Sequence, residues 1–73
     1  MNISSRAASQ LHALDATDCA SVLDTLRDTE IGPGSHLIEI VTPGQTAFRC
    51  FVARHRDGSL VLLGVLESRP RAP

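Results

Sequence analysis

The sequence contains no lysine, no tyrosine and no tryptophan, and it has only two phenylalanines, Phe48 and Phe51. A hydrophobic core must therefore be built mainly from aliphatic side chains. The two cysteines are far apart and fit no metal-ligand spacing, and no cofactor-binding motif is present. No apolar run is long enough to span a bilayer, and the N-terminus has no signal-peptide pattern. We therefore expect a cytoplasmic protein with reduced thiols, without a metal, a cofactor or a membrane partner.

A chain of 73 residues with 42% hydrophobic content indicates one small domain, residues 1–73. Chains this short bury only about 60% of their unfolded surface, so a homodimer or a tight partner is a reasonable expectation. The net charge is −1, but residues 1–48 carry −4 and residues 49–73 carry +3. This asymmetry fits two solvated faces of opposite sign or, alternatively, a basic C-terminal site for phosphates or acidic partners. The lack of a basic footprint is not typical of a nucleic-acid-binding domain.

The first half of the chain has the periodicity of helices. Ser4 or Ser5 can cap a first helix by accepting a hydrogen bond from a free amide of its first turn. The sequence leaves open whether residues 5–29 form one helix or two. A break is favoured, with Asp15 or Thr17 as a new cap, because capping side chains compete with the helix for backbone bonds.

The second half alternates between apolar and polar side chains, as is typical of β-strands. Gly32 is expected to end the helical part as a left-handed C-cap. We expect three strands, at His36–Thr42, Thr46–His55 and Leu60–Leu66. The third strand is apolar on both faces, which favours a central or doubly covered position. Gly64 within it is expected to mark a bulge or a close approach.

Two turn sequences connect these strands. Thr42–Gln45 predicts a type II turn in which Gly44 takes positive φ. Arg56–Ser59 predicts a hairpin whose Asp-Gly pair forms a primed turn. Residues 1–4 and 69–73 are expected to be flexible. The predicted fold class is therefore α+β, with one or two N-terminal helices followed by a three-stranded antiparallel β-meander.

The candidates for chemistry are arginines, one glutamate and one histidine. Arg49 lies in the middle of a strand, and Glu39 occupies the matching position on the neighbouring strand. The two residues form either a structural cross-strand pair or a site at which Arg49 holds a phosphate bidentately. His55 is flanked by Arg54 and Arg56 beside a hairpin. An imidazole there can act as acid or base next to a bound phosphate, although hairpin ends are also polar without any function.

A set of short motifs runs from about residue 20 to the end of the chain. They are the loop Ile31–Gly34, the strand core Ile38–Glu39–Ile40, the pair Phe48–Arg49, the apolar strand Leu60–Gly64 and the basic segment Glu67–Pro73. In this order the motifs resemble the RelE/HigB superfamily of toxins, especially its small phage-derived branch. The resemblance implies helices followed by an antiparallel sheet. It also implies a ribosome-dependent mRNA endonuclease that an antitoxin neutralises.

By this resemblance, Arg49 binds phosphate and stabilises the transition state, and Glu39 is a base or orients Arg49. His55 is the further catalytic candidate. RNA cleavage without a metal needs several cations around the scissile phosphate. The candidates for binding RNA or a partner are Arg54, Arg56, Arg69 and Arg71.

The alternative interpretation is a non-enzymatic interaction protein of phage or plasmid type, such as a regulator or an inhibitor. It would bind a macromolecular partner through its sheet or through its arginine-rich C-terminal end. The expected partners are thus an antitoxin-like or other protein, or the ribosome with its mRNA, and the sequence leaves open whether the chain is an enzyme.

Overall fold

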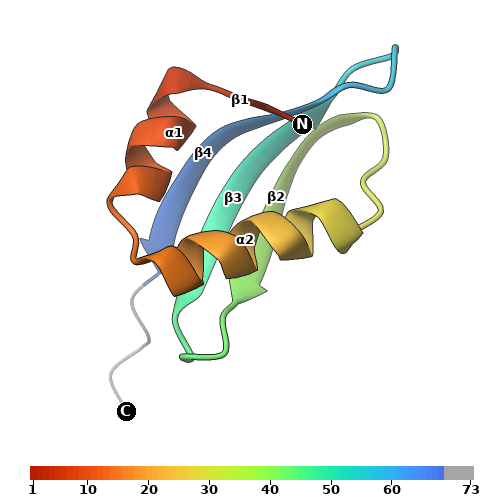
Figure 1. Ribbon diagram of the computed structural model, residues 1–73. Coiled ribbons are helices and arrows are strands. Elements are labelled where there is room, and N and C mark those ends of the chain that lie inside the picture. The colour runs from red at the N-terminus through yellow and green to blue at the C-terminus, as the bar shows by residue number, and fades with distance from the viewer. Residues whose placement is uncertain (69–73) are drawn as a thin grey trace.

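The computed structural model describes residues 1–68 and has two helices and a four-stranded mixed sheet (Figure 1). The predicted α+β class, with both helices ahead of the main sheet, is confirmed. The sheet has four strands and is mixed, whereas the prediction was three antiparallel strands. The predictions for residues 69–73 lie outside the described residues. The elements in chain order are β1 (Asn2–Ile3), α1 (Ser5–His12), α2 (Ala16–Asp28), β2 (Gly34–Val41), β3 (Ala47–Arg54) and β4 (Leu60–Ser68).

Both helices begin at side chains that satisfy free backbone amides. Ser4 Oγ accepts a hydrogen bond from the backbone N–H of Ala7 at 3.1 Å. Asp15 Oδ1 accepts one from the N–H of Asp18 at 2.8 Å. The first amides of a helix have no partner inside it, so such caps fix where a helix starts. The predicted break at Asp15 is confirmed, and the chain has two helices instead of one.

Helix α2 ends before Gly32, the glycine that was predicted to cap it. Thr29 already has extended backbone angles, φ −87° and ψ 129°, and its hydroxyl donates to the carbonyl of Thr25 at 2.6 Å. Gly32 has no positive φ. Its predicted role as a left-handed C-cap is therefore wrong, because the chain leaves the helical conformation three residues before it.

The N-terminus forms a short strand where the sequence predicted a flexible end. Asn2 and Ile3 of β1 pair in parallel with Val61 and Leu62 of β4. The N–H of Ser4 continues this pairing by donating to the carbonyl of Leu62 at 2.9 Å. Two residues carry no readable periodicity, and their partners lie at the far end of the chain, so the strand has no local signal.

The strand order is β1-β4-β3-β2, and β3 pairs in antiparallel orientation with both β2 and β4. Strand β4 is thus central, as predicted. Phe51 pairs with Gly64 but Val52 pairs with Leu62, so Leu63 is an extra residue and forms a bulge. A Cβ at Gly64 would lie 3.4 Å from Gln10 Oε1. The bulge and the close approach predicted at Gly64 are both present.

The two hairpins share one loop geometry that differs from both predictions. Each has a three-residue loop, within Thr42–Thr46 and within His55–Ser59, closed by a backbone bond of 2.9 Å. Positive φ occurs at the third loop residue, 64° at Gln45 and 91° at Gly58. Gly44 has no positive φ, so the type II turn is wrong, and the primed turn is wrong because only its glycine is left-handed. A left-handed residue after an ordinary turn matches the strand twist in three-residue loops.

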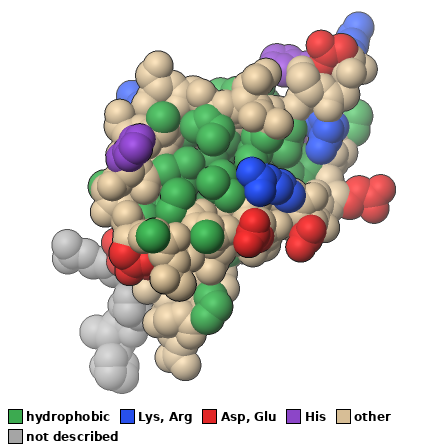
Figure 2. All heavy atoms as spheres, in the orientation of Figure 1, with side chains coloured by type: hydrophobic (Ala, Val, Ile, Leu, Met, Phe, Trp, Pro, Cys, Tyr) green, Lys and Arg blue, Asp and Glu red, His purple; other side chains and the backbone are tan. Residues whose placement is uncertain are grey.

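Both helices lie over the same face of the sheet, and the core fills the space between (Figure 1). On this helix side, hydrophobic side chains remain visible between the two helices (Figure 2). Within residues 1–68, no helix is long and apolar enough to cross a membrane. The buried core consists of aliphatic residues with one aromatic ring and one thiol: Ala7, Leu11, Val22, Leu26, Ile31, Ile40, Phe48, Cys50, Val52, Leu62 and Val65.

Candidate functional site

The face of the sheet that points away from the helices is open, and we call it the outer face. On β3, Phe48, Cys50 and Val52 point into the core, so the alternate residues Arg49 and Phe51 point outward. The strand register continues this face across the sheet. It sets Leu37 beside Phe51, Glu39 beside Arg49, and Leu66 on the other side of Arg49.

Large apolar side chains are concentrated on the outer face. Among the described residues, seven large hydrophobic side chains are exposed, and only Met1 and Ile3 lie elsewhere. Contiguous exposed apolar patches of more than a few hundred Å² are unusual and mark interaction sites in many proteins. The five on the outer face, with their exposed fractions, are Leu37 (55%), Val41 (65%), Phe51 (40%), Leu63 (44%) and Leu66 (50%).

Helix α1 borders the outer face along β4. Gln10 Oε1 accepts a hydrogen bond from the N–H of Val65 at 2.6 Å, which holds the helix against the strand. Because Gly64 has no side chain, a groove of about 320 Å³ opens at this border. Its lining is mostly apolar and consists of Arg6, Gln10, Phe51, Leu63, Gly64 and Leu66.

A smaller groove of about 230 Å³ lies on the helix side. It is lined by Ile3, Ala8, Leu11, His12 and Cys19, and Figure 2 shows apolar side chains in this region between the helices. Most of the exposed large apolar side chains of the described residues nevertheless lie on the outer face.

Burial raises the pKa of the other thiol, Cys50, to about 11, which marks that residue as an unreactive part of the core.

Two opposite charges, Glu39 and Arg49, stand directly opposite each other on the outer face. Along two antiparallel strands, residue pairs with and without backbone hydrogen bonds alternate. Thr42 and Thr46 are hydrogen-bonded, so Glu39 and Arg49, three pairs further along, form a pair without backbone hydrogen bonds, in which side chains come closest. Both side chains are exposed. Among the described residues, however, the ion pair present is Arg27–Asp24, at 3.7 Å on the surface of α2. Glu39 and Arg49 therefore share a face without being joined within 4.0 Å.

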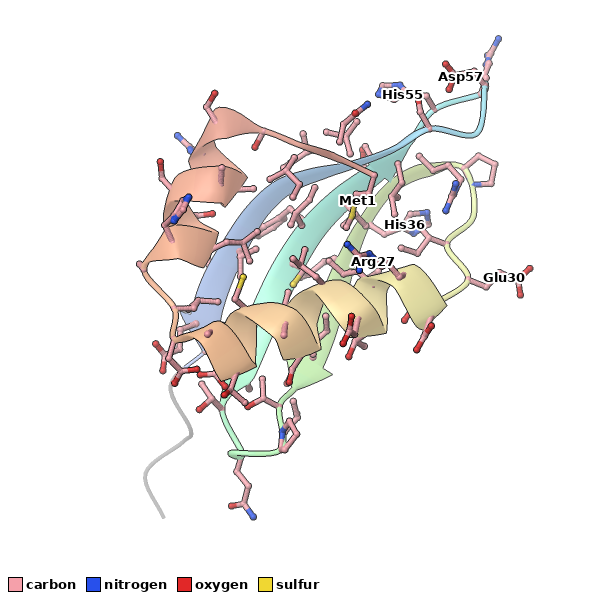
Figure 3. The ribbon with its side chains drawn as sticks, in the orientation of Figure 1. Met1, Arg27, Glu30, His36, His55 and Asp57 are labelled. Atoms are coloured by element: carbon pink, nitrogen blue, oxygen red, sulfur yellow. The ribbon has the colours of Figure 1, made fainter. Side chains whose placement is uncertain are left out.

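His55 lies away from these two charges, at the tip of the β3–β4 hairpin (Figure 3). It lies six positions along the extended chain from Arg49, a distance of about 20 Å. Asp57 shares the tip, and the hydroxyl and N–H of Ser59 hold the pKa of its carboxyl below the usual value, with a smaller contribution from His55. The structure thus brings Glu39 and Arg49 together but does not bring His55 to them.

The candidate arginines are also distributed. Arg54 points to the helix side, where its Nε donates to the carbonyl of Ile31 and its Nη1 to the carbonyl of Gly58, both at 2.6 Å. This guanidinium joins the α2–β2 loop to the hairpin and has a structural role. Arg56 is exposed at the hairpin tip. Arg69 and Arg71 lie outside the described residues.

The sequence contains a signal for the open apolar face, but that signal predicted a strand covered on both sides. The residues of β4 are apolar on both faces, which favoured a doubly covered strand. Both helices cover the same side of the sheet, so the second apolar face meets solvent instead. Leu37 and Val41 on β2 carry the same signal, because a strand with one solvated face needs no large apolar residue there.

Within residues 1–68, no group of three or more His, Cys, Asp or Glu side chains could hold a metal ion. No protein-family model, no curated protein and no solved structure matches the chain. Function must therefore be inferred from the surface of the molecule itself.

Proposed function

We propose that this chain is a non-enzymatic interaction protein that binds a protein partner through the outer face of its sheet. The observation that carries this proposal is the group of five exposed, large apolar side chains on a face that no helix covers. Protein interfaces typically have an apolar centre with a few polar and charged groups that fix the orientation. Glu39 and Arg49, set among Leu37, Phe51 and Leu66, give the outer face this composition.

The distribution of the catalytic candidates supports binding over catalysis. Metal-free cleavage of RNA requires several cationic groups around one phosphate. In the described part of the chain, Arg49 lies on the outer face, Arg54 is bonded to two carbonyls on the other side, and His55 is about 20 Å along the strand from Arg49. An apolar surface around a single arginine suits a protein partner better than a phosphate backbone.

A photo-crosslinking residue at Leu66 tests the proposal in the cells that encode the chain. Position 66 lies on the outer face, and the matched control, Thr25, is exposed on α2 at the opposite side. We expect discrete adducts, with this chain or with another protein, from position 66 and none of these adducts from position 25. Equal adducts from both positions, or none from position 66, would refute a binding role for the outer face.

A toxin of RelE/HigB type is the second candidate, and the Glu39–Arg49 register favours it. The resemblance requires an arginine with a neighbouring carboxylate on an accessible surface, and these two residues meet that requirement. In this case strong induced expression should arrest growth, and Arg49→Ala should relieve the arrest. Normal growth under strong expression of the wild-type chain would exclude the toxin.

A further inference from the structure

We propose that the protein covering the outer face is a second copy of this chain, so that the molecule is a face-to-face homodimer. This inference rests on the proposed binding role of the outer face and names its partner. A two-fold dimer uses the same patch on both subunits, so the patch must be complementary to itself. The charges and the apolar residues of the outer face each meet this condition.

The two charges are complementary under a two-fold axis. Glu39 and Arg49 are direct neighbours on β2 and β3, and neither is in an ion pair among the described residues. An axis that runs along the strands, between β2 and β3, sets Glu39 against Arg49 of the second copy and Arg49 against its Glu39. Each dimer then has two ion pairs across the interface, and no like charges meet at these positions.

The apolar residues are complementary under the same axis. Leu37 is the register partner of Phe51, so it lies over Phe51 of the second copy. In the next outward row, Val41 lies over Ala47 of the second copy. Two sheets packed face to face keep their strands roughly aligned and interdigitate their side chains, which this arrangement allows.

The small size of the chain also favours a dimer. The two strands beside this axis, β2 and β3, have eight residues each and cover about 26 by 10 Å, and their projecting side chains and the neighbouring β4 at the rim add to that area. A standard interface takes about 800 Å² from each partner. That area is about a sixth of the 5133 Å² accessible surface of the described chain. A 73-residue chain gains from such burial, because alone it buries a smaller share of its surface than a larger domain does.

Charge reversal, followed by sedimentation equilibrium of the full chain, tests this dimer. The wild type should be dimeric at micromolar concentration. Glu39→Arg and Arg49→Glu should each raise the dissociation constant at least about tenfold, because each variant places like charges together twice per dimer. An equimolar mixture of the two variants should dimerise again, since each altered position then meets its opposite in the other variant. An ion pair within one chain would not respond to mixing.

Three results would overturn the homodimer: a monomeric wild type, charge variants that dimerise as the wild type does, or a mixture that stays monomeric. Circular dichroism checks that each variant is folded. Where a charge reversal unfolds the chain, Leu37→Lys replaces it, and loss of the dimer is expected because Leu37 lies over Phe51 of the second copy. A monomeric wild type that still crosslinks from position 66 to another protein refutes the homodimer alone. A monomeric wild type without such adducts refutes the proposed function as well.

Discussion

Raising the pH from 9 to 11 should destabilise the fold through one buried thiol. Cys50 is fully buried, with Ile38 and Val65 as its register partners on the neighbouring strands. Burial raises the pKa of its thiol from 9.0 to about 11, because the thiolate would lose its hydration. The sequence has no lysine and no tyrosine, so no side chain of either type contributes to the pH dependence in this window.

The direction of the effect follows from which state loses its proton first. In the unfolded chain the Cys50 thiol ionises as the pH passes 9, whereas in the folded chain it stays protonated until about pH 11. Ionisation therefore stabilises the unfolded state across this window, and the free energy of unfolding falls as the pH rises. Two pKa units correspond to about 2.7 kcal/mol, a large share of the stability of a small domain.

Urea unfolding followed by circular dichroism measures this loss, at one protein concentration and at pH values from below 9 to 11. Cys50→Ala should lower stability below pH 9, where the thiol is protonated in both states, and should remove the contribution of this thiol to the pH dependence. The matched variant Cys19→Ala keeps the buried thiol and should retain that contribution. A wild type whose stability is flat across the window would refute the reasoning, as would a Cys50→Ala variant with the wild-type slope.

Three further predictions concern contacts that fix the fold, and urea unfolding midpoints check all of them. Gln45→Gly should raise the free energy of unfolding by about 1 kcal/mol, because a φ of 64° strains a residue that has a side chain. Gly58→Ala, at the equivalent position of the other hairpin, should lower the free energy of unfolding by a similar amount. Arg54→Met should lower it by about 2 kcal/mol by leaving two carbonyls without their donor, whereas Arg56→Met, at the exposed tip, should leave it unchanged. Gln10→Ala should lower it by about 1–2 kcal/mol, since a half-buried amide of β4 loses its acceptor. A change of the opposite sign would contradict the corresponding contact.

Features that depend on neighbouring residues could be predicted from the sequence. Ser4 and Asp15 cap helices because their side chains reach amides three residues away. The faces of β3 followed from alternation, and the Glu39–Arg49 register followed from the short loop between two strands. Gly64 was recognisable because a glycine inside an apolar strand usually has a geometric cause.

Features that depend on distant residues could not be predicted. Strand β1 exists because the edge of β4 offers partners to Asn2 and Ile3, and nothing in those two residues signals it. The left-handed conformation falls on Gln45, although Gly44 beside it is the better local candidate. Arg54 looked accessible beside a hairpin, but its two carbonyl partners become visible only in three dimensions.

Two properties of the candidate site are encoded in the sequence. The separation of His55 from Arg49 follows from six residues of strand, which span about 20 Å and exclude a shared catalytic centre. The outer face was encoded as apolar residues on both faces of the strands. A second helical layer and a binding partner satisfy that pattern equally well, so only the placement of both helices on one side decides between them.

Crosslinking from Leu66 in two matched backgrounds tests the binding role of the outer face most directly. Phe51→Asp places a carboxylate in the middle of that face, and Thr25→Asp places one on the exposed side of α2. Burying an unpaired carboxylate in an interface is costly, so the adduct yield should fall at least about tenfold in Phe51→Asp. The yield should be unchanged in Thr25→Asp. An undiminished yield in a folded Phe51→Asp variant would contradict the assignment of the outer face as the binding surface.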